Sequence, residues 1–306
     1  MGHRKYKVGE VAHIYRRSAD GIILFYTPID YLVMFIIVSV AARKYDIVVL
    51  GFCPMVDHLH LLLRAESRRS LSAFMRDITS QYARSLNETA QESGPVFSDE
   101  FGLANKTSVK AVRASINYVY NNPVEKKLCK TAEQWQWNFL AYADCDHPFS
   151  SDLKLRYAPN KLRKAVKYVK HEADLGRSIS HRRLSTIFEG LDDEQSKQLI
   201  DRTVEAYNFI DYGELLRYYK SYDAMLLAME SNTGGEYDIV EEFNHYSDSA
   251  YFKMTALLKK YGVVGTDRIL TMSTASRSLF ASRFARSKVA VQFQIRKYFH
   301  LTKKRR

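Results

Sequence analysis

Residues 57–63 read DHLHLLL, and this stretch decides the fold of the N-terminal half of the chain. Successive side chains of a β-strand point to opposite faces of the sheet, so His58 and His60 would share one face. The alternate residues, Leu59, Leu61 and Leu63, would point the other way into a core. Two imidazoles about 7 Å apart on one strand can converge on a divalent ion. The tripeptide is equally compatible with two half-buried histidines that make ordinary hydrogen bonds.

Further strands and helices are expected on both sides of this stretch. Strands are predicted at Val11–Tyr15 and Ile22–Tyr26, around a polar turn at residues 18–21, and at Ile47–Phe52. Helices are predicted at Ser70–Glu92 and from Ser108 to about Asn122, where Pro123 disfavours further helix. This mixture indicates an α+β domain.

The most apolar run of the chain, Tyr31–Ala42, is about 12 residues long, whereas a helix that crosses a bilayer needs roughly 20. It follows Thr27 and Pro28, which suit the cap and the first turn of a helix. We therefore expect a buried helix and no association with a membrane.

After about residue 150 the strand-like patterns largely end. Helices are predicted at 161–173, 192–207, 212–231 and 247–261. The predicted organisation is a domain over residues 1–150, followed by an all-helical region over residues 151–306.

A second stretch, residues 115–124, reads SINYVYNNPV. On a helix, Tyr120 falls on the apolar stripe that contains Ile116 and Val119, which suits a core tyrosine. Tyr118 and Asn122 lie one turn apart on the opposite, polar side. Tyr118 is therefore the better candidate for a reactive tyrosine, with Asn122 beside it as an oxygen ligand.

Together the two stretches suggest one chemistry. A divalent ion held by His58, His60 and Asn122 would bind a scissile phosphate and orient it for in-line attack. Tyr118 would attack through its phenolate, and nearby positive charge would favour that form because a free phenol has a pKa of about 10. The products would be a 5′-phosphotyrosine and a free 3′-OH.

The sequence resembles the HUH single-tyrosine transposases and, within them, the REP-associated tyrosine transposases of bacteria. The His-hydrophobic-His motif of that family is matched by residues 58–60, and its Tyr-Ile-x-x-Asn-Pro-Val motif by residues 118–124. Three further family features correspond, in the same order, to Leu71–Arg76, Gly94–Phe97 and Trp135–Trp137. The resemblance covers residues 8–145, about half of the chain.

The resemblance implies a central antiparallel sheet with helices on one face, similar to a ferredoxin-like domain. It implies that Tyr118 is the nucleophile and that His58, His60 and Asn122 are metal ligands. It also implies single-stranded DNA as the substrate, often near a hairpin. Two His and one amide oxygen suit Mg²⁺ or Mn²⁺ and do not decide between them.

Two positions depart from the family pattern. Asp57 stands where the family usually has Asn, so a carboxylate precedes the first metal-binding histidine. Residues 98–101, SDEF, replace a segment that usually carries Arg before the Phe. Asp99 and Glu100 thus place acidic charge where a phosphate contact is expected. This leaves open the alternative that the chain is a relative of these enzymes that no longer cleaves DNA.

The charge of the chain is concentrated at its C-terminal end. The formal net charge is +12, and residues 268–306 contain eleven Lys or Arg and no Asp or Glu. Such a bias favours nucleic acid as a partner, although a solvated basic tail is the simpler alternative.

This basic segment contains two expected short helices, 276–285 and 288–299, which indicate either a helix-turn-helix or a terminal helical hairpin. Gln292, Gln294 and Arg296 are the candidates for contacts with base edges. The DNA contacts are predicted to be Arg277, Arg283, Arg286, Lys288, Arg296 and Lys297.

Three separate cysteines favour a reducing compartment, and no signal-peptide core follows the N-terminus. We therefore expect a bacterial, cytoplasmic, nucleoid-associated protein, either a monomer or a homodimer. The leading hypothesis is a transposase that nicks and rejoins single-stranded DNA. The alternatives are a catalytically silent DNA-binding regulator and a replication or relaxase-type nickase, which the small core and the single candidate tyrosine disfavour.

Overall fold

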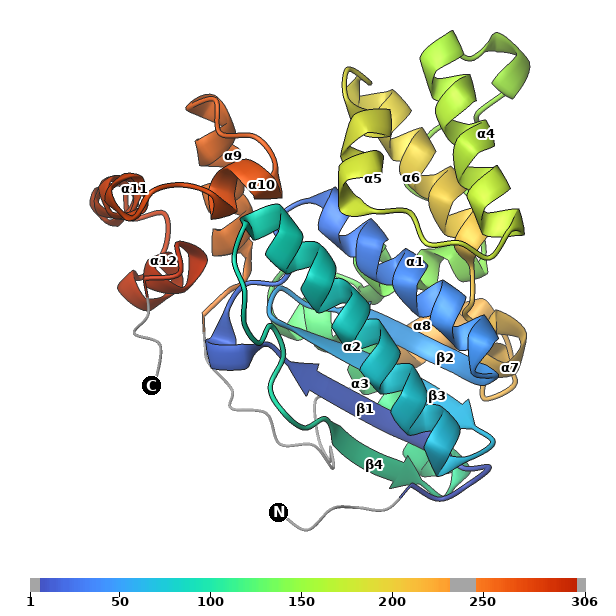
Figure 1. The fold of residues 1–306 in the computed structure, drawn as a ribbon. Coiled ribbons are helices and arrows are strands. Elements are labelled where there is room, and N and C mark those ends of the chain that lie inside the picture. Colours follow the sequence, from blue (N-terminus) through green and yellow to red (C-terminus); the bar gives the residue numbers. More distant parts are fainter. Residues whose placement is uncertain (1–5, 232–245, 302–306) are drawn as a thin grey trace.

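The computed structural model describes residues 6–231 and 246–301 of the 306-residue chain. A four-stranded antiparallel sheet forms its centre, with the strand order β2-β3-β1-β4 (Figure 1). The strands are β1 (Val11–Arg17), β2 (Ile47–Pro54), β3 (His58–Ala65) and β4 (Gly102–Lys106). The antiparallel α+β fold expected from the sequence is thus confirmed.

The register of β1 and β3 determines which side chains share a face. Ile14 lies opposite Leu61, and Tyr15 lies opposite His60. Leu61 and Ile14 are fully buried in the main core, as are the leucines at 59 and 63. Because strand side chains alternate, His58 and His60 point to the other face, as the sequence predicts.

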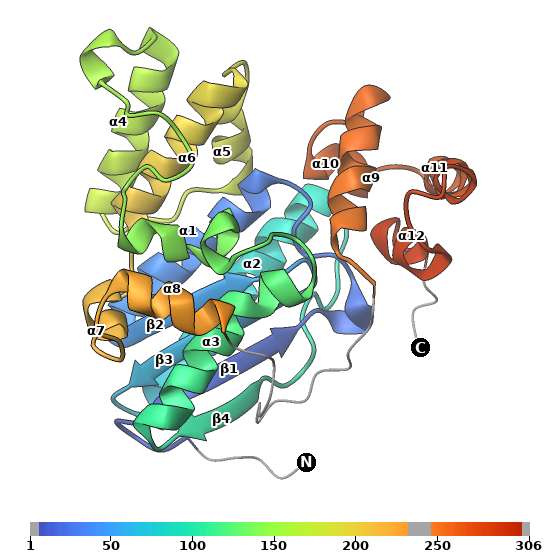
Figure 2. The same cartoon turned by 180° about the vertical axis from the view of Figure 1, so that it is seen from behind.

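Helices cover both faces of the sheet. Helices α1 (Pro28–Lys44) and α2 (Arg68–Ala90) pack on the face that carries the leucines, and α3 (Val109–Glu125) packs on the other (Figures 1 and 2). The expectation of helices on one face only therefore needs correction. The second face also carries apolar residues, among them Leu50 and Leu62, and the apolar stripe of α3 buries them.

The apolar run 31–42 forms most of α1 and is almost entirely buried, as expected. Asp30 accepts hydrogen bonds from the backbone N–H groups of Tyr26 and Thr27, which fixes the start of this helix. In the described parts of the chain, no helix combines the length and the apolar character that a bilayer crossing requires.

Within the sheet domain, three elements differ from the prediction. Ile22–Tyr26 is not a strand, because β3 and β4 occupy both edges of β1 and this segment hydrogen-bonds to Val56 instead. Strand β4 is additional. Helix α3 continues two residues past Pro123, because a proline in the last turn removes only one backbone hydrogen bond.

The second half of the described chain is helical, as predicted. Its helices are α4 (Asn160–Asp174), α5 (His181–Phe188), α6 (Asp193–Tyr207), α7 (Tyr212–Leu216), α8 (Tyr222–Glu230), α9 (Ser249–Lys260), α10 (Thr266–Leu270), α11 (Thr274–Arg286) and α12 (Gln292–Tyr298). Five short 3₁₀ turns, η1 (Ala19–Gly21), η2 (Ala132–Gln134), η3 (Gln136–Asn138), η4 (Leu140–Ala143) and η5 (Leu155–Tyr157), complete the described elements. The single helix predicted at 212–231 is two helices, because Ser221 caps a new start by accepting the N–H of Ala224.

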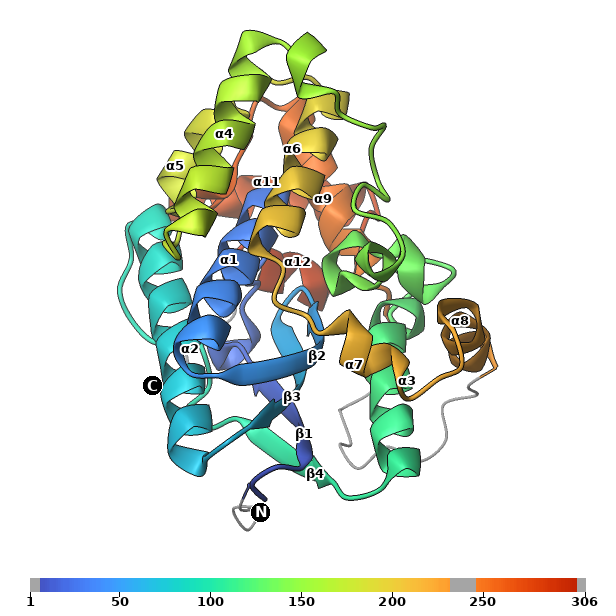
Figure 3. The same cartoon turned by 90° about the vertical axis from the view of Figure 1, so that its right-hand side faces the viewer.

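These helices form two groups on different sides of the sheet domain (Figures 1 and 3). Helices α4 to α6 lie over α1, and the segment after α6 reaches the free edge of β2, where Asp211 donates its N–H to Val49. Helices α9 to α12 form the other group, which we call the C-terminal module (residues 246–301). One continuous core joins both groups to the sheet domain, from Tyr6 to Phe299.

Candidate functional site

The face of the sheet beneath α3 collects the predicted site residues. Strand β3 contributes His58 and His60, and α3 contributes Tyr118 and Asn122 (Figure 2 shows α3 on this face). All four are buried, with exposed fractions of 5% or less. A motif on a strand and a motif on a helix, about 60 residues apart in sequence, thus meet in one place.

His58 is held from one side by its neighbour in sequence. Its Nδ1 lies 2.6 Å from Oδ1 of Asp57, and the other carboxylate oxygen of Asp57 accepts a hydrogen bond from Nζ of Lys297 in α12. A carboxylate on one ring nitrogen orients the ring and makes the other nitrogen a better metal ligand. Asp57, the departure from the family pattern, therefore acts on His58 in a way that suits metal binding.

His60 lies between two side chains from other elements. Its Nδ1 is 3.0 Å from Nε2 of His13 in β1, and its Nε2 is 3.1 Å from Nδ2 of Asn122. With a proton on Nδ1, His60 donates to His13 and presents the lone pair of Nε2 toward Asn122. His13 thus orients His60 in the same way that Asp57 orients His58.

The two tyrosines of α3 have different surroundings. The Tyr118 ring makes edge contacts with His13 and His60, with ring centroids 5.4 Å apart in each case. Tyr120 points to the sheet, where its hydroxyl donates to the carbonyl of Leu50 and burial raises its pKa well above the usual value. The contrast agrees with the sequence-based assignment of Tyr120 to the core.

The donor atoms around His60 fit a divalent ion. Among the described residues, Oδ1 of Asn122 is buried and accepts no hydrogen bond. Such an atom is costly unless a partner is supplied, and an amide oxygen is a ligand that Mg²⁺ and Mn²⁺ accept. In the structure Nδ2 of Asn122 donates to Nε2 of His60 at 3.1 Å, and a half-turn of the amide would place Oδ1 beside the same nitrogen, where both could bind one ion.

The acidic pair at residues 99–100 acts on the other face of the sheet. Burial lowers the pKa of Arg16, and the charges of Asp99 and Glu100 oppose that shift. Arg16 alternates with Tyr15 along β1, so its side chain points away from His58 and His60. The charges of both carboxylates therefore act on a half-buried arginine whose side chain points away from the two histidines.

The basic residues predicted to contact DNA divide into two sets. Four are exposed: Arg283 and Arg286 on α11, Lys288 in the turn that follows it, and Arg296 on α12. Arg277 is half-buried and bonds the carbonyl of Leu270, and Lys297 is paired with Asp57. Their role in DNA binding stays a prediction. Gln294 is 3% exposed and donates to the carbonyl of Ser247, so the expectation that it reads a base edge is wrong for this conformation.

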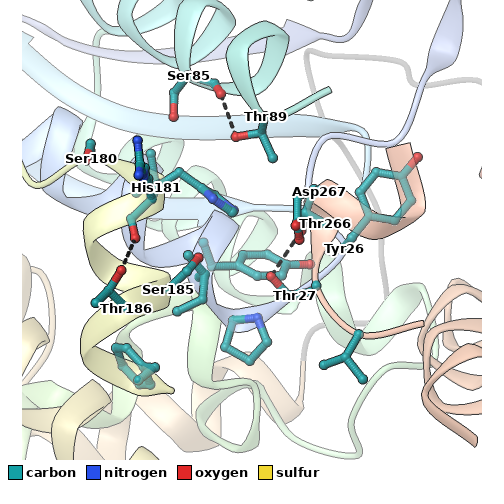
Figure 4. A pocket seen from close by; sticks show the side chains of 18 of the residues that line it. Tyr26, Thr27, Ser85, Thr89, Ser180, His181, Ser185, Thr186, Thr266 and Asp267 are labelled. Atoms are coloured by element: carbon teal, nitrogen blue, oxygen red, sulfur yellow. Dashed lines mark hydrogen bonds between the residues drawn. The ribbon is translucent and has the colours of Figure 1, made fainter. Parts of the chain in front are cut away.

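A large cleft lies elsewhere, and none of the predicted site residues lines it. It has a volume of about 1710 Å³ and opens between α1, α2 and α5 on one side and α9 and α10 on the other. At its base, Asp30 binds Nε2 of His181 at 3.0 Å and accepts the Thr266 hydroxyl at 2.6 Å (Figure 4 shows Thr27 and Thr266 hydrogen-bonded beside them). These bonds tie α5 and α10 to the start of α1, and the cleft marks where the two helical groups meet.

Sequence reasoning missed His13 and Asp248. The alternation of Ala12 and Ile14 with His13 and Tyr15 was the available signal, because it places His13 on the same strand face as Tyr15. Nothing local marks Asp248, which is brought near His58 by packing of the C-terminal module. Its pKa is raised to about 6 by burial and by the charge of Asp57. Cys145, Asp146 and His147 cluster as possible ligands, but they are consecutive residues on an irregular surface segment away from this site.

Comparisons with known proteins give one family match and one similar structure. Residues 30–122 match the model of a family described as IS200-like transposases, and the match includes the first candidate motif and the second as far as Asn122. A search of curated proteins found no match. A solved structure of a REP-associated tyrosine transposase bound to a REP hairpin is similar at 18% identity, over 44% of this chain and 79% of that one, with a TM-score of 0.38. The family match confirms the resemblance to transposases over the stretch that carries His58, His60, Tyr118 and Asn122.

Proposed function

We propose that this chain is a metal-dependent transposase that cleaves and rejoins single-stranded DNA through a covalent 5′-phosphotyrosine on Tyr118. One observation carries the proposal: the Tyr118 ring contacts His60, and Nε2 of His60 faces Asn122 at 3.1 Å. The candidate nucleophile and the candidate ligands are therefore neighbours on one sheet face. The transposase family match over residues 30–122 supports the same reading.

The residues divide the chemistry among them. His58, His60 and Asn122 would hold Mg²⁺ or Mn²⁺, which when bound supplies positive charge to the non-bridging oxygens of the scissile phosphate. Asp57 and His13 keep the two imidazoles in orientation. Single-stranded or hairpin DNA is the proposed substrate, in keeping with the net charge of +12.

The cleavage step conserves bonds and protons. The phenolic oxygen of Tyr118 forms a bond to phosphorus while the bond from phosphorus to the 3′ oxygen breaks. The phenol gives up its proton, and the 3′ oxygen leaves and becomes a 3′-OH by taking up one. Because one phosphodiester replaces another, a 3′-OH can later attack the phosphotyrosine and rejoin the strands without ATP.

A covalent adduct on a denaturing gel tests the proposal. The full chain is incubated with labelled single-stranded hairpin DNA and Mn²⁺ or Mg²⁺. We expect a band of protein joined to DNA that is lost in Tyr118→Phe and kept in Tyr120→Phe. The second variant is the matched control, since it removes the same hydroxyl two residues away on the same helix. An adduct that persists in Tyr118→Phe would contradict the assignment of the nucleophile.

The second candidate function is a catalytically silent DNA-binding regulator. The observation that favours it is the burial of Tyr118, which is only 5% exposed. Tight binding of hairpin DNA without an adduct on any hairpin, at any concentration of Mn²⁺, would favour this function over the transposase.

A further inference from the structure

The last helix of the described chain reaches the strand side of the site. Lys297 lies in α12, 240 residues after Asp57, and its ammonium bonds Oδ2 of that carboxylate. Both side chains are largely shielded from water, with exposed fractions of 18% and 26%. The opposite oxygen of Asp57 holds Nδ1 of His58 at 2.6 Å. A chain of two contacts thus connects α12 to a candidate metal ligand.

The same helix also reaches the helix side of the site. Gln294, one turn before Lys297, is buried and donates from Nε2 to the carbonyl of Ser247 at 3.0 Å. The Ser247 hydroxyl and the Asp248 N–H both donate to the carbonyl of Lys126, each at 3.3 Å. Lys126 caps the C-terminal end of α3, the helix that carries Tyr118 and Asn122.

We propose that α12 positions the two halves of the site against each other, with Lys297 acting through Asp57 on His58 and Gln294 acting through Ser247 on α3. Both are positioning residues, because neither touches the candidate ligands directly. The identity of the site they serve rests on the function proposed above.

Charge around Asp57 supports this arrangement. Burial by itself raises the pKa of Asp57, but the charge of Lys297 and the hydrogen bond with His58 hold it well below its usual range. A buried carboxylate needs a cation nearby, because an unpaired buried charge is strongly unfavourable. Lys297 supplies that cation, so the Asp that replaces the usual Asn of the family is matched by a lysine outside the catalytic domain.

The two sides of α12 face different surroundings. Arg296 is exposed and Lys297 faces inward, although they are adjacent in sequence. The inward side of this helix alone therefore carries the contacts that reach Asp57 and Ser247.

The experiment measures Mn²⁺ affinity by calorimetry on the full chain, without DNA. Lys297→Met keeps the length of the side chain and removes its charge, and we expect the Kd for Mn²⁺ to rise about 3- to 10-fold. Lys297→Arg should stay within about 2-fold of the wild type, because it keeps the cation. Lys253→Met, on the exposed side of α9, is the matched control and should leave the Kd unchanged.

A double-mutant cycle and hydrogen exchange give readouts that general destabilisation would not reproduce. In an Asp57→Asn background, Lys297→Met should have no further effect on the Kd, because its partner is gone. Without metal, Lys297→Met should raise deuterium uptake at residues 55–61, and Gln294→Met should raise it at residues 119–128.

The outcomes separate this inference from the proposed function. The inference is overturned if Lys297→Met has the Kd for Mn²⁺ and the deuterium uptake of the wild type. It is also overturned if Lys253→Met weakens Mn²⁺ binding as much as Lys297→Met does. If the wild-type chain binds no Mn²⁺, the proposed metal site is refuted. The positioning role of α12 is then tested only by the deuterium uptake of the variants at residues 55–61 and 119–128.

Discussion

The sheet domain and the C-terminal module differ in how their polar side chains relate to local sequence. In the sheet domain, His58, His60 and Asn122 lie where the periodicity of one strand and one helix places them. In the C-terminal module, adjacent residues of one helix serve different surfaces, since Arg296 is exposed and Lys297 binds Asp57. Periodicity gives the direction of a side chain from its own element, whereas the partner it meets depends on packing between elements.

The largest expected effect tests the sheet-domain side of this contrast. His60→Gln removes a candidate ligand and should weaken Mn²⁺ binding and adduct yield at least about 100-fold, while His13→Gln should cost only about 10-fold because it acts through His60. Calorimetry and the denaturing gel measure the two quantities, and circular dichroism checks the fold. Equal losses in the two variants would mean that His13 is itself a ligand.

A second prediction tests the exposed basic side of the C-terminal module. Replacing Arg283, Arg286 and Lys288 together by alanine should reduce the slope of log Kd for DNA against log salt by about 2 to 3, since each phosphate contact contributes about 0.7 to 0.9. Lys297→Met should leave that slope unchanged, because its ammonium is already paired with Asp57. Fluorescence anisotropy at several salt concentrations provides the slopes. A salt slope that falls equally in Lys297→Met would show that this lysine contacts DNA after all.

The smallest expected effect concerns the contact of Asp30 with His181, which ties α5 to the start of α1. Burial alone would lower the pKa of His181, but the hydrogen bond and charge of Asp30, aided by Asp267, raise it. A raised folded-state pKa means that this pair stabilises the fold fully below the unfolded pKa of about 6.5 and loses its contribution as pH rises past the folded value. His181→Gln should flatten the fall in the free energy of unfolding above pH 6.5. Urea titrations at several pH values measure the free energy of unfolding. If its dependence on pH is the same in His181→Gln and in the wild type, the pair of His181 and Asp30 does not contribute to stability.

Much of the sheet domain follows from local patterns. The alternation at 57–63 predicts both the core leucines and the shared face of the histidines, and the helical phase at 115–124 correctly places Tyr120 in the core, although Tyr118 is buried in the same apolar cluster. The segment Ile22–Tyr26 shows the limit, because an apolar β-prone run can equally become a buried connection when the strand edges are taken by others. The edge strand β4 is not predicted, because its sequence contains Gly102 and Asn105, two residue types that are uncommon in strands. Pairing with β1 nevertheless makes it a strand.

The rest of the site depends on contacts over long sequence separations. His13 meets His60 across 47 residues, and Lys297 meets Asp57 across 240. Neither contact has a local signature, because the two partners of each belong to elements whose packing is decided by the whole core. For this reason the shared face of the two candidate metal ligands of β3 is predictable from the chain, whereas the contacts that His13 and Lys297 make are not.

The coverage of both sheet faces has a consequence for variation in this protein. Along β3, successive side chains meet different surroundings: Leu59 and Leu61 pack in the main core, whereas His58 and His60 lie on the face that α3 covers. Substitutions of the leucines should therefore mainly lower the stability of the fold, and substitutions of the histidines should mainly affect the site proposed on the other face. Neighbouring positions of one strand thus differ in the property that a substitution changes.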